Sequence, residues 1–233
     1  MKTLGLIGGT TWISTADYYR IINQLTNERL GGVSSAKMLL YSMNFEEFKP
    51  PADPKEWGSR EQDLIAISQK LERGGAECIV ICANTPHLLA DRIQEKIGIP
   101  LIHIAEETAK EVAKQNIKTV GLLGTRITME QPFFEERLAK LGISTVIPDD
   151  ADRDFIHWAI FNEMGKNIFT AETKKRHLAI IEDLKKKGAR GVIFGCTEIP
   201  TLIKPNECDI PTFDTTFIHA KAAVEFALRS SDE

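Results

Sequence analysis

The sequence lacks the charge pattern and the apolar segments that identify nucleic-acid-binding or membrane proteins. Its 233 residues contain 29 Lys and Arg against 33 Asp and Glu, a net charge of −4. The sequence therefore lacks the excess of basic residues that binds the phosphate backbone of nucleic acids. No stretch approaches the length of a membrane span, and Gly8, Gly9 and Thr10 interrupt the first apolar run before it could form a signal-peptide core. We therefore expect a cytoplasmic protein with a small-molecule substrate, no nucleic-acid partner and no membrane association.

Cysteine is scarce, and its spacing does not indicate a metal site. The four cysteines are Cys78, Cys82, Cys196 and Cys208. They lack the paired close spacing of a zinc site, and a reducing compartment disfavours structural disulfides. Free thiols and no bound metal are the expectation.

A dinucleotide-binding fingerprint is also missing. The opening "GLIGGT" predicts a turn from a strand into a helix, but it lacks the Gly-x-Gly-x-x-Gly spacing. No acidic ribose ligand is clearly placed about 20 residues further on. A nucleotide-dependent enzyme is therefore disfavoured.

What the sequence does contain is an alternation of strand and helix patterns. Short apolar runs such as "TLGLIGG", "ECIVICA", "TVGLLGT", "PLIHI" and "RGVIFGC" predict strands, and "AETKKRHLAIIEDLKKKGA" places apolar residues at helical spacing and ends near a glycine. Alternating strands and helices are typical of parallel sheets covered by helices. The predicted class is α/β.

An internal repeat divides the pattern into two halves. Residues 3–10, "TLGLIGGT", resemble residues 119–126, "TVGLLGTR", and "GGAECIVICANTPHLL" at 74–89 resembles "KGARGVIFGCTEIPTL" at 187–202. The repeat predicts two pseudo-symmetric three-layer α/β domains with parallel sheets.

The expected domain boundaries follow from a further similarity between "IPLIHIAEETAK" and "IPTFDTTFIHAK". We expect a first domain over residues 1–100, a second over 101–209, and a C-terminal segment, 210–233, that returns to the first. Ligands bind at the carboxyl ends of parallel strands. This predicts an active site in a cleft between the two domains.

Three motifs resemble a known family. "VIFGCTEIPTLI", "VICANTPH" and the opening "GLIGGTTWISTADYY" occur at the spacing found in the aspartate/glutamate racemase superfamily, and the opening is similar to the aspartate racemase branch. One departure is Ile13, where that branch usually has an acidic residue. The resemblance covers essentially the whole chain and implies a homodimeric amino-acid racemase, for aspartate or glutamate, that uses no PLP or other cofactor.

The family chemistry assigns a role to Cys196. One thiolate removes the α-proton of the substrate, and a protonated thiol on the opposite face returns one. Cys196 ends a predicted strand where a helix begins, and we expect the helix N-terminus to lower the pKa of its thiol. Cys196 is the predicted catalytic base.

The identity of the second base stays open. Aligning the two halves pairs Gly75 with Gly188, an offset of 188 − 75 = 113 residues, and 196 − 113 = 83. Residue 83 is Ala83, whereas Cys82 is the neighbour that would point to the opposite face of a strand. Either a bulge brings Cys82 into the site as the second catalytic thiol, or Cys196 works with water or a neighbouring group.

Other polar residues follow the predicted strand ends. By resemblance Asn84, Thr85, Thr197 and Glu198 contact the substrate, although helix capping would also explain Asn84 and Thr197. The predicted substrate-binding set further includes Thr10, Thr125 and Lys166, the last as a partner for a substrate carboxylate. Weaker candidates are Arg60, expected on a loop, and His87. Packing or capping is the expected role of both His87 and His103.

Two other functions remain. One is a single-cysteine decarboxylase or isomerase of small dicarboxylic acids on the same fold, and the other is a non-catalytic amino-acid-binding protein. A binding protein would bind an amino acid without exchanging its α-proton with solvent, which distinguishes it from the racemase and from the single-cysteine enzyme.

Overall fold

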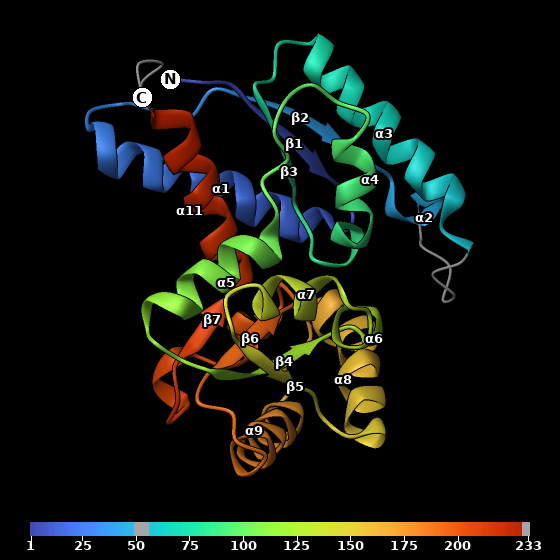
Figure 1. The fold of residues 1–233 in the computed structure, drawn as a ribbon, viewed down its shortest axis with the longest axis vertical. Helices are drawn as coiled ribbons and strands as arrows, with labels where there is room; N and C mark the ends of the chain where they lie inside the picture. Colours follow the sequence, from blue (N-terminus) through green and yellow to red (C-terminus); the bar gives the residue numbers. More distant parts are fainter. Residues whose placement is uncertain (49–55, 230–233) are drawn as a thin grey trace. The chain divides into compact units, whose positions relative to one another are not determined.

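The computed structural model describes residues 1–48 and 56–229 and divides the chain into two compact units (Figure 1). Unit 1 comprises Met1–His103 together with the chain from His219 onward, and unit 2 comprises Ile104–Ile218. The chain therefore passes between the units twice. Each unit contains one parallel sheet with helices, which confirms the predicted α/β class.

Unit 1 is built on a three-stranded parallel sheet of order β2-β1-β3. Helices α1 and α11 lie on one side of this sheet and α3 on the other (Figure 1). The elements are β1 (Leu4–Gly8), α1 (Trp12–Leu30), β2 (Met38–Ser42), α2 (Phe45–Phe48), α3 (Gly58–Arg73), β3 (Cys78–Ile81), η2 (Thr85–Leu89), α4 (Ala90–Gln94) and most of α11 (Thr215–Leu228).

The core of unit 1 follows the alternation of its strands. Side chains from every second position of β1 and β3 pack against α1 and α11, because successive side chains of a strand point to opposite faces, and both faces of these two strands are buried. The fully buried members of this core are Leu4, Leu6, Tyr18, Ile22, Cys78, Val80, Cys82, Ala220, Ala223 and Ala227.

Unit 2 contains a four-stranded parallel sheet of order β5-β4-β6-β7. Helices α5 and α7 pack together on one side of this sheet and α9 lies on the other (Figure 1). The elements are α5 (Ile104–Lys114), β4 (Thr119–Gly124), α6 (Arg126–Glu130), α7 (Phe133–Ala139), β5 (Ser144–Val146), α8 (Asp150–Asn162), η3 (Met164–Lys166), α9 (Ala171–Lys186), β6 (Val192–Gly195), α10 (Ile199–Leu202), η4 (Pro205–Glu207) and β7 (Thr212–Asp214).

The two sheets share one plan. The order β2-β1-β3 of unit 1 matches β5-β4-β6 of unit 2. In unit 2 the strand β7 pairs with β6, and at the corresponding place in unit 1 Leu101 makes an isolated bridge to Ile79 of β3. These pairings also shift the boundaries from those expected. Leu101 stays with unit 1 because it bridges β3, and β7 stays with unit 2 because it pairs with β6.

Glycine is required where each strand end approaches other backbone. Gly9 has φ +90°, and a Cβ there would collide with the backbone of Met43, so only glycine permits this turn from β1 into α1. In unit 2 a Cβ on Gly195 would lie 2.8 Å from the carbonyl oxygen of Leu123. Glycine at position 195 therefore allows the end of β6 to lie close against the backbone of β4.

Among residues 1–48 and 56–229, no helix combines the length and the apolar character needed to cross a membrane.

Candidate active site

In unit 2 the end of β6 positions Cys196. Its side chain is 9% exposed. The carbonyl oxygen of Phe194, two residues earlier, accepts a hydrogen bond of 2.8 Å from the hydroxyl of Thr215 at the start of α11. The end of the strand is thus fixed by backbone pairing with β4 and by a side chain from the segment after β7.

Glu198 is the partner of the Cys196 thiol. The Cys196 Sγ donates to Oε2 of Glu198 at 2.9 Å, and the Thr197 hydroxyl donates to the same oxygen at 2.8 Å. Burial raises the pKa of the Cys196 thiol well above its usual range, and the charge and hydrogen bond of Glu198 raise it further. The resting thiol is therefore protonated at neutral pH.

The expected lowering of the Cys196 pKa by a helix N-terminus is wrong. Helix α10 has only four residues, so its dipole is small. The backbone hydrogen bonds of Thr197 and Glu198 do lower the thiol pKa, but burial and the carboxylate of Glu198 outweigh them.

Two more residues of the predicted substrate-binding set lie in unit 2, one as a helix cap and one on the surface. Thr125 caps α6, because its hydroxyl accepts a hydrogen bond from the backbone N–H of Thr128 at 3.2 Å. It lies at the end of β4, the strand beside β6, and is partly exposed. Lys166 is exposed in η3, after α8.

In unit 1 the structure places Cys82 in the hydrophobic core. Its side chain has no exposed surface and belongs to the cluster between the sheet and helices α1 and α11. Its Sγ lies 3.9 Å from the carbonyl oxygen of Val80, and burial raises the pKa of the thiol. This position opposes the alternative in which Cys82 is the second catalytic thiol.

The sheet registers determine which residues of the two units are equivalent. Gly5 of β1 lies opposite Ile79 of β3, and the matching Gly121 of β4 lies opposite Val192 of β6. The difference, 192 − 79 = 113, equals the offset of the ungapped sequence repeat.

The same offset persists to the strand ends. Ile7 pairs with Ile81, and Leu123 pairs with Phe194, again 194 − 81 = 113. No insertion changes the offset within the paired residues, and the backbone N–H of Cys82 still donates to the carbonyl oxygen of Ile7. The offset therefore favours Ala83 as the unit 1 counterpart of Cys196. Ala83 is partly exposed.

The remaining predicted residues of unit 1 surround Ala83 in sequence or lie on the neighbouring strand end. Thr10, after β1, is 8% exposed, and its hydroxyl has no hydrogen-bond partner within the described part of the chain. Asn84 is buried and precedes η2 without a side-chain capping bond, while Thr85 begins η2 and is half-buried. Capping therefore does not account for Asn84.

The weaker candidates occupy structural positions. Arg60 lies within α3, not on a loop, and forms an ion pair of 3.4 Å with Asp63. His87 and His103 are buried in unit 1, with ring centroids 5.1 Å apart.

Some residues that fix the strand ends had no signal in the sequence. The Ser14 hydroxyl donates to the carbonyl oxygen of Cys82 at 2.7 Å, across 68 positions, and the Thr15 hydroxyl accepts from the backbone N–H of Gly9 at 2.8 Å. Thr215 performs the same task in unit 2. Such contacts depend on the tertiary arrangement, which periodicity does not describe.

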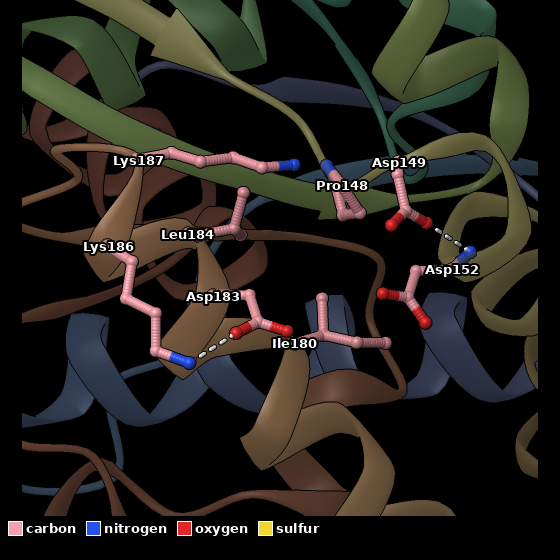
Figure 2. A pocket seen from close by; sticks show the side chains of 8 residues that line it. All are labelled: Pro148, Asp149, Asp152, Ile180, Asp183, Leu184, Lys186 and Lys187. Atoms are coloured by element: carbon pink, nitrogen blue, oxygen red, sulfur yellow. Dashed lines mark hydrogen bonds and ion pairs between the residues drawn. The ribbon is translucent and has the colours of Figure 1, made fainter.

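A groove of about 300 Å³ in unit 2 contains none of the predicted site residues (Figure 2). Three of its charged side chains are already engaged, since Asp149 caps α8 through the N–H of Asp152 and Asp183 pairs with Lys186 at 2.7 Å. The lining residues are Pro148, Asp149, Asp152, Ile180, Asp183, Leu184, Lys186 and Lys187.

Comparisons of the sequence and of the structure with known proteins both find amino-acid racemases. A family model described as Asp/Glu/hydantoin racemase matches residues 7–223. The fold is similar to a crystal structure of a putative Asp/Glu racemase from Yersinia pestis, with 44% identity, a TM-score of 0.92, and coverage of 98% of this chain and 100% of that one.

Two further relatives agree. An aspartate racemase homologue from Pyrococcus horikoshii OT3 has 35% identity and a TM-score of 0.86, covering 98% of this chain and 100% of that one. The broad specificity amino-acid racemase RacX from Bacillus subtilis (strain 168) is 25% identical over 179 residues, which are 73% of this chain and 74% of the relative.

Proposed function

Because the chain belongs to the Asp/Glu/hydantoin racemase family, we propose that it is a cofactor-independent amino-acid racemase in which Cys196 exchanges the α-proton of aspartate or glutamate. The match over residues 7–223 confirms the family resemblance seen in the motifs. The observation that carries the proposal is the Cys196 thiol at the end of β6, hydrogen-bonded to Glu198 at 2.9 Å.

The hydrogen bond between Cys196 and Glu198 gives the thiol a way to become the thiolate that the reaction needs as a base. Transfer of the Sγ proton to Oε2 of Glu198 gives a thiolate and a neutral carboxylic acid. The thiolate then takes the α-proton, and the electron pair of the broken C–H bond stays on the substrate as a carbanion. The raised pKa makes the thiolate a strong base once formed.

The second proton comes from water in this proposal. The counterpart of Cys196 is Ala83, which cannot donate, and Cys82 packs in the core. A water that protonates the carbanion on its other face becomes hydroxide, and the carboxylic acid of Glu198 releases its proton to solvent, where the two combine as water. Protons balance, and the α-carbon is inverted. That both strand ends act on one substrate, in a cleft between the two domains, remains a prediction.

Polar groups around both strand ends suit an amino-acid substrate. The buried Thr10 hydroxyl without a partner among the described residues suits a substrate carboxylate or ammonium, and Asn84, Thr85, Thr125 and Thr197 add further polar groups. The exposed ammonium of Lys166 suits the side-chain carboxylate of aspartate or glutamate.

Ala83 also favours one alternative. An enzyme with a single thiol can protonate a carbanion left by loss of CO₂, so a decarboxylase of small dicarboxylic acids fits the same site. The racemase proposal requires a second proton donor, whereas this alternative does not.

Proton NMR in deuterium oxide separates these functions. We expect the α-proton signals of L-aspartate or L-glutamate to disappear with the protein present, with the D-isomer accumulating in a parallel chiral analysis. Exchange without any D-isomer would contradict racemisation. CO₂ release from a dicarboxylic acid, without amino-acid exchange, would favour the decarboxylase. Binding without exchange would leave only the binding protein.

A further inference from the structure

Three of the five histidines of the chain gather in the interior of unit 1. The ring centroid of His87 lies 5.1 Å from that of His103 and 5.2 Å from that of His219. His103 is the last residue of unit 1 before the chain enters unit 2, and His219 is the first after it returns. His87 therefore contacts both segments at which the chain changes unit.

The ring of His219, which contacts His87, is held in place by two hydrogen bonds. Its Nε2 lies 2.7 Å from the carbonyl oxygen of Ile102, and because a carbonyl only accepts, Nε2 carries the proton. Its Nδ1 then accepts from the hydroxyl of Tyr18 at 2.8 Å. Both ring nitrogens are engaged, so the ring is fixed in position.

His87 holds the backbone that follows β3. Its Nδ1 donates to the carbonyl oxygen of Ala83 at 2.8 Å, and its backbone N–H donates to the carbonyl oxygen of Asn84 at 3.0 Å. The Ser14 hydroxyl donates to the carbonyl oxygen of Cys82. Three consecutive carbonyl groups are thus held by groups that are themselves buried.

Unit 2 lacks this contact at the equivalent strand end. The offset of 113 residues places Pro200 at the position of His87, and a proline side chain has no donor. Of the two equivalent strand ends, the one with this contact is therefore the one that carries alanine in place of the thiol. In the proposed function this strand end binds the substrate through polar side chains and backbone groups. Substrate binding there therefore depends on the position of the backbone.

We infer that His87 is a positioning residue, whose Nδ1–H fixes Ala83, Asn84 and Thr85 in the arrangement that binds the substrate. This inference rests on the proposed function, for which it identifies a residue that acts through its neighbours without touching the substrate.

The chain provides a matched control in His177 of α9. His177 is fully buried, and its Nδ1 donates to a backbone carbonyl four residues earlier, that of Thr173, at 2.8 Å. His87 makes the same contact to Ala83. Helix α9 contains none of the predicted site residues, so His177 tests the purely structural effect of losing such a bond.

Three variants separate positioning from stability. Asn retains a donor at the place of Nδ1, whereas Gln places its amide near Nε2. We expect His87→Asn to keep kcat within about threefold of wild type and His87→Gln to lower kcat at least about tenfold, since small displacements in an active site have large effects on rate. His177→Gln should lower thermal stability and leave kcat within about twofold.

Hydrogen–deuterium exchange provides a readout that does not depend on activity. His87→Gln should speed amide exchange in residues 83–85, and His177→Gln should leave these amides as in wild type. If wild-type protein shows no α-proton exchange, the proposed function fails, and amide exchange alone decides the positioning role. Unchanged exchange in residues 83–85, or equal kcat losses in His87→Asn and His87→Gln, would overturn the inference.

Discussion

At the scale of the residue, the account depends on one difference between two equivalent positions. The offset between the sheet registers, continued past the paired residues, makes Ala83 the counterpart of Cys196 in the repeated motif. The sequence offset predicted this equivalence, and the pairing up to Ile81 and Phe194 keeps the same offset without an insertion. The sequence could not predict the pKa of Cys196, because that depends on burial and on a side-chain hydrogen bond to Glu198.

The burial of Cys82 gives a direct test of the single-thiol proposal. We expect Cys82→Ala to exchange the α-proton of the substrate within about threefold of the wild-type rate. The variant should also lose about 1 kcal/mol in free energy of unfolding, because the change leaves a small cavity in the core. Exchange rates under saturating substrate and urea denaturation would measure the two effects.

A loss of exchange with little loss of stability would contradict this expectation. It would show that Cys82 leaves the core to act as the second base, as the alternative from sequence proposed.

At the scale of the element, the apolar runs predicted β1, β3, β4 and β6 correctly, and helical spacing predicted α9. The stretch "PLIHI" is an exception, because it forms only one bridge, from Leu101 to Ile79, before α5 begins at Ile104. Pattern alone could not distinguish this bridge from a strand. Nor could it reveal that α10 has a single turn, which is why the expected effect of its dipole on Cys196 was wrong.

The burial of His219 in α11 makes stability depend on pH. Burial of His219 lowers its pKa to about 3, with a smaller contribution from His87. The folded protein therefore keeps His219 neutral, while the unfolded chain binds a proton below about pH 6.5. Stability from this group is present above pH 6.5 and is lost between about pH 6.5 and 3, amounting to about 2 kcal/mol at pH 5.

Comparison with a variant isolates this contribution. Denaturant unfolding at pH 7.5 and pH 5 should show a larger drop for wild type than for His219→Gln, which cannot titrate and keeps a donor near Ile102. Equal drops in the two proteins would contradict the assignment. The comparison is needed because His157 and His177 also have lowered pKa values through burial.

At the scale of the whole molecule, one plan occurs twice with different chemistry at its strand ends. Unit 2 provides an ionisable thiol and a carboxylate, and unit 1 provides a fixed backbone edge with Thr10, Asn84 and Thr85. The repeat in the sequence predicted the common plan, because strand motifs recur at a constant offset. The hydrogen bonds that fix each edge join residues far apart in sequence, so only the structure reveals them. The homodimer remains a prediction.

The measurement that tests the central claim most directly compares Cys196→Ser with Cys208→Ser. Both are thiols of unit 2, but Cys208 follows η4 and is partly exposed, and no site role is assigned to it. With L-aspartate and L-glutamate in deuterium oxide, we expect Cys208→Ser to exchange the α-proton as wild type does and Cys196→Ser to show at least a thousandfold loss, roughly the effect of removing a catalytic base. Exchange by Cys196→Ser at the wild-type rate would contradict the account.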